Sequence, residues 1–389
     1  MFEIMEKDSQ EAVIKVIGVG GCGGNAIEHM ITKNLSGVEF ICANTDMQAL
    51  KKSNAKTVLQ IGVDITKGLG AGAKPEIGRE AALEDRDRIA EIIDGADMLF
   101  ITAGMGGGTG TGAAPIIAEV AKEMGILTVA VVTKPFSFEG KRTKVASDGL
   151  EELSQHVDSL IVIPNEKLME VLGEDVPFLE AFRAANDVLH NAVSGIAEII
   201  NCPGLVNVDF ADVRTVMSEM GMAMMGSAEA SGPDRARIAA EQAVASPLLE
   251  DVNLANARGV LINITASASF KMKEYYDVMN TIKEFTAEDA TVIVGNVMDE
   301  TMGDKLRVTM VATGLNGAIS RRQQKPELRV MQTLMTGTNS QPVFVDSGMI
   351  EDETPAVFSQ NNRRAQVEAM KMSGVEEYDI PAFLRKQAD

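Results

Sequence analysis

The residues best suited to chemistry form a glycine loop at residues 103–115, which reads AGMGGGTGTGAAP. Residues 106–112 consist of five glycines and two threonines. Glycine loses more conformational entropy on folding than any other residue, so this many glycines are expected only where the backbone must approach another group closely. An apolar run at 96–102 predicts a buried strand before the loop, and residues 113–124 repeat apolar side chains at helical spacing after it. A strand, a glycine loop and a helix N-terminus together gather backbone N–H groups around an anion, to which the threonines add hydroxyls. A flexible linker has a similar composition, but it is not expected between a strand and a helix.

A second unit of the same kind lies near the start of the chain. Residues 12–20 predict a strand, a glycine run follows, and residues 26–32 predict a helix. Gly18-x-Gly20-x-x-Gly23 matches the dinucleotide fingerprint, and Asp46 after the next strand keeps a nicotinamide-dependent dehydrogenase open as an alternative. That alternative leaves the richer loop at 106–112 unexplained. No GxxxxGK[ST] motif occurs, so phosphates would be held by amides, threonine hydroxyls, helix dipoles and a metal ion.

Composition narrows the class of protein. With 389 residues, 45% of them hydrophobic, the chain can build two packed domains and a tail. The formal charge of −20 argues against a nucleic-acid partner. Three scattered cysteines and three histidines provide no metal motif. The N-terminus lacks a signal sequence and no apolar run approaches the ~20 residues of a spanning helix, so we expect a cytoplasmic protein without direct membrane insertion.

The remaining elements support these loops. Further strands are expected at 38–43, 127–133 and 159–164, helices at 76–94, 178–200 and 272–285, and a second group of strands at 258–265, 290–297 and 305–313. A methionine-rich stretch at 217–225 is expected to fill core space, although an adaptable peptide groove has the same composition. Residues 318–376 show no sustained period and predict a disordered linker.

An acidic pair stands out in the segment NVDFADV. Asp209 suits a helix N-cap, and Asp212 suits the first turn of a helix at 210–220. Because the two residues are three apart in the sequence, both carboxylates point to one side of that helical turn. On the residues alone, a structural role as helix caps accounts for this spacing.

GGGTGTG, NVDFADVR and DIPAFLRKQAD occur in this order, and the chain resembles the tubulin and FtsZ family of self-assembling GTPases over residues 12–317 and 377–389. The resemblance implies an α/β, tubulin-like fold in which a Rossmann-like nucleotide-binding domain is joined by a central helix to a smaller α/β domain, with a disordered tail. The implied parts are an N-terminal arm (1–11), a GTP-binding domain (12–177), the central helix (178–202), a GTPase-activating domain (203–317), a linker (318–376) and a partner-binding peptide (377–389).

The resemblance also implies a GTP/GDP site, with Mg²⁺ carried by the nucleotide rather than by a side-chain motif. The residues implied to surround the phosphates are Gly20, Gly21, Cys22, Gly23, Gly24, Asn25, Ala71, Gly72, Gly104, Gly106, Gly107, Gly108, Thr109 and Gly110. Those implied for the nucleoside are Asn44, Glu139 at the ribose and Asp187 at the guanine edge. The resemblance also implies that Pro135, Arg142, Thr143 and Asn186 contact the nucleotide. The chain departs from the family pattern at Cys22, usually glycine, and at Thr143, usually arginine, so Arg142 is expected to make the arginine contact.

Catalysis and partners follow from the same resemblance. Asp209 and Asp212, assisted by Asn207, would enter the GTP site of the next subunit, so that hydrolysis accompanies head-to-tail filaments of the mid-cell division ring. The C-terminal peptide would bind membrane tethers and division regulators through Asp379, Ile380, Pro381, Phe383 and Leu384. A nucleotide-binding scaffold without turnover is the remaining alternative.

Overall fold

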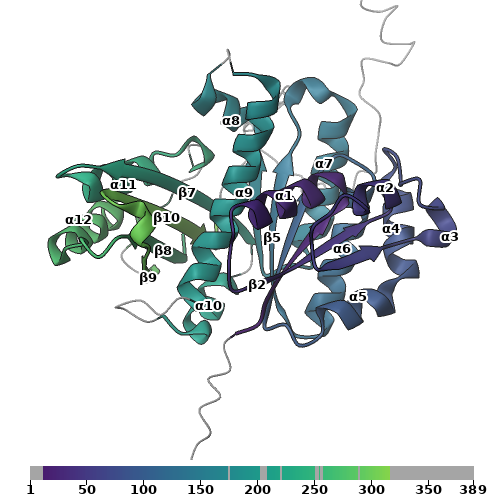
Figure 1. The fold of residues 1–389 in the computed structure, drawn as a ribbon, viewed down its shortest axis with the longest axis horizontal. Coiled ribbons are helices and arrows are strands. Elements are labelled where there is room, and N and C mark those ends of the chain that lie inside the picture. Colours follow the sequence, from purple (N-terminus) through teal and green to yellow (C-terminus); the bar gives the residue numbers. More distant parts are fainter. Residues whose placement is uncertain are drawn as a thin grey trace, which may run out of the picture. The chain divides into compact units, whose positions relative to one another are not determined.

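The computed structural model describes residues 12–173, 176–201, 208–219, 221–249, 254, 257–287 and 290–315. The expected N-terminal arm, linker and C-terminal peptide therefore lie outside the described residues, as does Asn207. The fold class expected from the resemblance is confirmed: α/β layers are built around a sheet of both parallel and antiparallel strands (Figure 1).

One ten-stranded sheet runs through the described chain in the order β3-β2-β1-β4-β5-β6-β7-β10-β8-β9. Its strands are β1 (Ile14–Val19), β2 (Val38–Asn44), β3 (Thr57–Gln60), β4 (Met98–Gly104), β5 (Leu127–Lys134), β6 (Ser159–Pro164), β7 (Gly221–Ser231), β8 (Gly259–Ala266), β9 (Thr291–Met298) and β10 (Lys305–Thr313). Pairing is parallel from β3 to β6 and antiparallel on both sides of β10.

The helices follow the strands in the alternating manner that parallel pairing requires. They are α1 (Gly20–Thr32), α2 (Met47–Leu50), α3 (Val63–Thr66), α4 (Pro75–Glu84), α5 (Arg86–Ile93), α6 (Thr109–Glu123), α7 (Lys141–Ser154), α8 (Asn165–Leu172), α9 (Phe178–Asn201), α10 (Phe210–Met217), α11 (Arg235–Val244) and α12 (Met272–Lys283), with short 3₁₀ turns η1 (Ser137–Glu139), η2 (Pro247–Leu249) and η4 (Glu300–Met302).

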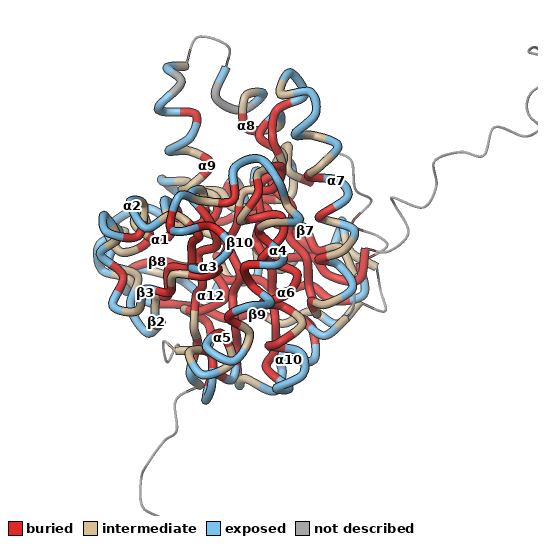
Figure 2. The backbone as a smooth tube through the Cα atoms, turned by 90° about the vertical axis from the view of Figure 1, so that its right-hand side faces the viewer, coloured by how far each residue is buried: buried red, intermediate tan, exposed pale blue. Residues whose placement is uncertain are grey.

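Strand β4 shows why helices must cover both sheet faces. Met98 and Phe100 point into a core shared with α1 and α9, whereas Leu99 and Ile101 point into a core shared with α5 and α6. All four side chains are fully buried, as expected for a central parallel strand. Figure 2 shows buried residues concentrated along the strands and exposed ones on the outer helix surfaces. A third core lies between β8, β10, α11 and α12.

Both glycine segments are helical for much of their length, contrary to expectation. α1 begins at Gly20 and α6 at Thr109, so several glycines predicted as loop form first helical turns, and Pro115 lies inside α6 rather than in its first turn. Close contact between backbone segments explains why these helical positions are glycines. An added Cβ at Gly23 would overlap the carbonyl oxygen of Thr102, and one at Gly112 would overlap that of Pro75.

Two further expectations required correction. The single helix predicted at 76–94 is broken at Asp85, whose buried carboxylate accepts hydrogen bonds from Gly62 N (2.7 Å) and from Arg88 Nη1 (2.7 Å). The methionine-rich segment is largely strand β7, which the sequence reading missed. Its core role is nevertheless confirmed at Met217 and Met225, which are buried.

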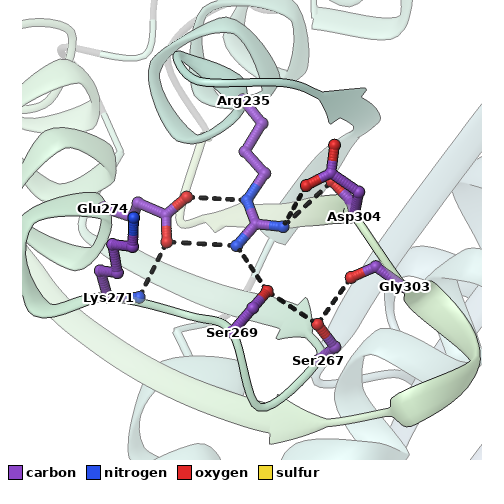
Figure 3. Close-up of polar contacts among 7 residues, drawn as sticks. All are labelled: Arg235, Ser267, Ser269, Lys271, Glu274, Gly303 and Asp304. Atoms are coloured by element: carbon purple, nitrogen blue, oxygen red, sulfur yellow. Dashed lines mark hydrogen bonds and ion pairs between the residues drawn. The ribbon is translucent and has the colours of Figure 1, made fainter.

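A buried ion pair fixes the loops of the second half of the sheet (Figure 3). Arg235, which begins α11, donates from Nε to Glu274 Oε1 (2.7 Å) and from Nη2 to Ser269 Oγ (3.1 Å). The same guanidinium donates to the carbonyl oxygen of Asp304 (3.0 Å). A buried charge is costly unless it is paired, so Arg235 must keep these partners. It thereby ties the start of α11 to α12 at Glu274, to the loop after β8 at Ser269 and to the loop before β10 at Asp304.

Among the described residues, none of the helices is both long enough and apolar enough to cross a lipid bilayer.

The contact between α4 and α6 yields a stability prediction. Gly112→Ala would push a methyl group into the backbone of α4 at Pro75, so we expect a loss of about 1–3 kcal/mol in the free energy of unfolding. Urea unfolding of the ligand-free chain, followed by circular dichroism, measures it.

Gly21→Ala is the matched control, because Gly21 is also in the first turns of a helix but an added Cβ there meets nothing within 4 Å. Helix propensity alone should make this exchange neutral or stabilising by up to about 1 kcal/mol. Equal unfolding midpoints for the two variants would contradict the close-packing explanation.

Candidate functional site

Two helix N-termini meet beside the carboxyl ends of neighbouring strands. β1 and β4 pair in register through Val19 and Ala103, and the helices α1 and α6 begin shortly after those positions. An added Cβ at Gly20 would lie 3.0 Å from Gly110 N, so the two helix starts are in contact. Within the described chain, no side chain caps either helix. First-turn N–H groups without a cap form a ready site for an anion.

A cavity of about 320 Å³ opens at this point. An added Cβ at Gly21, Gly72 or Gly107 would meet nothing within 4 Å, so these glycines leave open space on its wall. Twelve of the expected site residues line it: Gly21, Cys22, Gly72, Gly104, Gly107, Gly108, Thr109, Gly110, Pro135, Glu139, Arg142 and Asn186. The structure thus brings together residues from five segments that are far apart in the sequence.

Other expected residues lie in the same segments without lining the cavity: Gly20, Gly23, Gly24, Asn25, Ala71, Gly106 and Thr143. Asn44, the last residue of β2, does not line it either. Asn44 is buried and its Oδ1 accepts from Asp46 N (3.2 Å). Thr143 turns away, since its hydroxyl donates to the carbonyl oxygen of Phe136 (3.2 Å). Arg142, rather than Thr143, therefore faces the cavity.

The charged groups on the cavity wall are partly compensated. Arg142 Nη1 lies 2.5 Å from Glu139 Oε2, and Arg142 Nε donates to the carbonyl oxygen of Gly106 (3.4 Å). The guanidinium is half exposed, so it can turn toward a ligand at little cost. This pair gives the cavity one cation and one carboxylate.

Cys22 provides a side chain at a position where the family resemblance implies glycine. Its Sγ lies 3.7 Å from Thr133 Oγ1, and an added Cβ at Gly104 would lie 2.6 Å from Cys22 Cβ. Burial raises the pKa of the Cys22 thiol, against weaker opposing effects of Thr133 and Arg142. The thiol is therefore neutral near pH 7 and brings no negative charge to an anion site.

Asn165 is a wall residue that sequence reasoning missed. Only 8% of its surface is exposed, and its Oδ1 is buried without a hydrogen-bond partner among the described residues. A buried acceptor or amide without a partner is costly, so this group is suited to a ligand. The available signal was its position directly after strand β6, since ligands bind at the carboxyl ends of parallel strands. Phe182, Ala185 and Thr133 were missed as well.

Asp187 is not part of this cavity wall. It lines a neighbouring cavity of about 410 Å³ with Ala184, Val188 and Asn191 of the same helix α9. Its Oδ1 lies 2.8 Å from His29 Nε2 and 3.3 Å from Lys33 Nζ. Partial burial alone would raise the pKa of Asp187, but the hydrogen bonds from His29 and Lys33 outweigh it and lower the pKa. The carboxylate is therefore ionised.

The expected catalytic pair lies elsewhere. Asp209 and Asp212 are both exposed at the start of α10, where Asp209 Oδ1 accepts from Asp212 N (2.9 Å) as an N-cap. Arg214 of the same helix donates to the carbonyl oxygen of Gly125 (3.2 Å), which follows the C-terminal end of α6. The pair thus lies near the end of α6 that is opposite the cavity. Asn207 and the five peptide residues (Asp379, Ile380, Pro381, Phe383 and Leu384) lie outside the described residues.

No group of three or more His, Cys, Asp or Glu side chains in the described ranges could hold a metal ion. Among the described residues that line the cavity, Glu139 is the one with a carboxylate, and it is paired with Arg142. The cavity's own groups therefore fit an anion, and a divalent cation would be held mainly through that anion's oxygens.

His190 lies in helix α9, three residues after Asp187, and its pKa is lowered. Its ring lies edge-on to His29, with 6.3 Å between centroids, and among the described residues its buried Nδ1 has no hydrogen-bond partner. Burial lowers the pKa of His190 to about 4, assisted by the positive charges of Arg307, His29 and Lys33.

The shifted pKa predicts a pH effect. Between about pH 6.5 and 4 the unfolded chain binds a proton at His190 that the folded chain does not, so this histidine lowers the free energy of unfolding as the pH falls. His190→Gln removes that contribution, and urea midpoints between pH 7 and 5 should fall less steeply than in the unmodified chain. His156→Gln controls for loss of a histidine, and identical slopes for His190→Gln and the unmodified chain would contradict the shift.

Comparison with known proteins extends these observations. Residues 13–173 match the model of the Tubulin/FtsZ family, GTPase domain, and residues 221–316 match that of the FtsZ family, C-terminal domain. The chain is 57% identical over 399 residues to the cell division protein FtsZ of Pseudomonas aeruginosa, covering 100% of both chains. It is also 57% identical over 387 residues to that of Coxiella burnetii, covering 99% of each.

Among solved structures, an empty FtsZ dimer from M. jannaschii superposes with a TM-score of 0.76 at 45% identity, covering 79% of this chain and 89% of that one. CetZ2 from Haloferax volcanii shares the fold at 19% identity, with a TM-score of 0.66, covering 79% of this chain and 94% of that one. Most of the cavity wall lies within the part of the chain that matches the GTPase domain model, and helix α9 adds Phe182, Ala185 and Asn186 from outside it. The chain belongs to the Tubulin/FtsZ family and is a GTPase of the cell-division cytoskeleton.

Proposed function

We propose that this GTPase assembles head to tail into filaments of the division ring, and that GTP bound in the cavity of one subunit is hydrolysed with help from Asp209 and Asp212 of the next. The observation that carries the proposal is the separation of these aspartates from the cavity within one chain. The cavity is at the N-terminal end of α6, and α10 contacts Gly125, two residues past the C-terminal end of α6. A helix of 15 residues is about 22 Å long.

The strand register supports the same separation. β7 follows α10 closely, and its first residue, Gly221, pairs with Ser159, the first residue of β6. The cavity, in contrast, lies at the carboxyl ends of β1, β4, β5 and β6. α10 and the cavity therefore lie toward opposite ends of the parallel strands. The exposed carboxylates of Asp209 and Asp212 can then reach a phosphate only in a neighbouring molecule. Such a contact is heterologous and does not close, so it generates filaments.

The cavity itself suits the phosphate tail of GTP. The uncapped N-termini of α1 and α6 provide backbone N–H groups, Thr109 provides a hydroxyl and Arg142 provides a charge. Bound Mg²⁺ would supply further positive charge and would be held through the phosphates, because Glu139 is engaged with Arg142. The carboxylates of Asp209 and Asp212 would orient the attacking water, and Asn207 would assist them.

The nucleoside would extend from this cavity toward α9. Glu139 and Arg142 lie on the ribose side, Phe182 offers an aromatic face, and Asn165 offers its amide. Asp187 Oδ1 lies near His29 and Lys33, and we propose that the carboxylate also accepts from the ring N–H and the amino group of guanine, a donor pair that adenine lacks. The dehydrogenase alternative gives no role to residues 106–112, whereas here both glycine segments contribute to one cavity.

We further propose a cytoplasmic location at the inner face of the membrane at mid-cell, the domain boundaries given above, and recruitment of membrane tethers and division regulators through residues 377–389. Support for the peptide comes from its sequence alone, in which Ile380, Phe383 and Leu384 form an apolar patch after a long polar segment.

Exchange of one aspartate tests the shared site. Asp212→Ala should bind GDP and GTP as the unmodified chain does, because α10 does not contribute to the cavity of its own subunit, yet its GTP turnover should fall at least about 100-fold. Phosphate release, measured with nucleotide binding in parallel, separates the two effects. In the unmodified chain the rate per subunit should vanish together with light scattering below a threshold concentration.

A mixing experiment provides the control. Gly107→Val fills the open wall of the cavity and should abolish nucleotide binding while leaving Asp212 in place. Mixed with Asp212→Ala, it should restore hydrolysis above the sum of the separate rates, because each variant supplies what the other lacks. A rate per subunit that is constant on dilution would mean that one molecule hydrolyses alone, and bound GTP that is never consumed would favour a scaffold without turnover.

Deletion of residues 379–389 tests the peptide. The truncated chain should assemble with GTP at the same threshold concentration and should lose binding to a membrane-tether protein. A truncation that no longer assembles would contradict a purely tethering role.

A further inference from the structure

A pair of hydroxyl groups lies behind the cavity wall. Thr45, which follows strand β2, has no exposed surface, and its Oγ1 lies 2.7 Å from Thr109 Oγ1. Thr109 is the first residue of α6 and lines the cavity. The same Thr45 oxygen accepts the backbone N–H of Ala71 at 3.0 Å. Thr45 was not among the expected site residues and does not line the cavity itself, but its hydroxyl contacts Thr109, which does.

Counting protons shows why this arrangement matters. A threonine hydroxyl has one proton to donate and two lone pairs. At Thr45, one lone pair is taken by the N–H of Ala71, and one proton must lie between the two threonines. If Thr109 donates it, Thr109 presents only lone pairs to the cavity. If Thr45 donates it, Thr109 keeps its own proton for a ligand.

We propose that Thr45 is a positioning residue that keeps the Thr109 hydroxyl turned as a donor toward a phosphate oxygen of the bound nucleotide. An anionic oxygen repels lone pairs and accepts a proton, so it selects the arrangement in which Thr45 donates. The inference rests on the proposed nucleotide site and adds to it a residue one contact removed from the ligand.

The same chain of hydrogen bonds extends to the segment before α4. From the backbone N–H of Ala71 it runs through Thr45 to Thr109 and ends at the ligand, and each bond polarises the next. Nucleotide phosphate thereby strengthens the attachment of the segment that carries Gly72 on the cavity wall.

The exchange Thr45→Val tests the proposal, with Thr45→Ser as the matched control. Valine keeps the shape of threonine and removes the hydroxyl, so GDP affinity should fall roughly fivefold, the effect of one ordinary hydrogen bond. Serine keeps the hydroxyl and should stay within about twofold of the unmodified chain. Competition against a fluorescent GDP analogue on the full chain measures both, and thermal unfolding without nucleotide verifies folding. Thr45→Ala replaces the valine variant if that variant does not fold.

Two further measurements separate positioning from structural damage. Guanosine has no phosphate, so its affinity should be unchanged by Thr45→Val, whereas a distorted site would weaken both ligands. In a Thr109→Val background, Thr45→Val should have no further effect on GDP affinity, because the residue through which it acts is gone.

The proposal is overturned if Thr45→Val binds GDP as the unmodified chain does, if guanosine affinity falls equally, or if the loss persists in full in the Thr109→Val background. Failure of the unmodified chain to bind GDP would instead refute the proposed nucleotide site, so the two failures are distinguishable.

Discussion

The candidate site depends on how closely one stretch of backbone can approach another. Gly23 lies against the carbonyl oxygen of Thr102 and Gly112 against that of Pro75, in each case with no space for a methyl group. The first contact holds α1 against β4 and the second holds α6 against α4, and the starts of α1 and α6 then meet at Gly20 and Gly110 beside one cavity. A phosphate-binding site built from backbone amides requires this proximity, because amides cannot reach out as lysine side chains do.

The electrostatics follow from the same constraint. A chain of formal charge −20 repels anions at long range, so attraction must come from groups within a few ångströms. Helix N-termini act over that distance and are screened little inside a cavity. Burial of Cys22 keeps its thiol protonated, and Glu139 is compensated by Arg142, so the wall adds little negative charge of its own.

Much of the fold could be predicted because the spacing of apolar residues and the positions of glycines depend on local structure. The central strands and the long helix α9 are confirmed, and twelve expected residues meet at one cavity. Features decided by distant contacts were not predictable. The carboxylate of Asp85 ends a helix because it holds Gly62 of another segment, and Asn165 joins the site only because β6 neighbours β5. β7 was missed because methionine and glycine give no alternating pattern, and its strand character comes from pairing with β6 and β10.

The pairing of β7 has a mechanical consequence. Its first three residues pair with β6 in parallel, and residues 224–231 pair with β10 in the antiparallel sense, so one strand belongs to both halves of the sheet. Among the described residues, the halves are connected by the short parallel seam, by helix α9, which packs on β5 as well as on β8 to β10, by α8 against η2, and by α10, which packs on β8 and β9 and bonds to Gly125. Tension along the strands therefore loads three residue pairs of the sheet in shear at this seam, against seven between β4 and β5. Resistance to twisting there depends also on the packing of α8, α9 and α10.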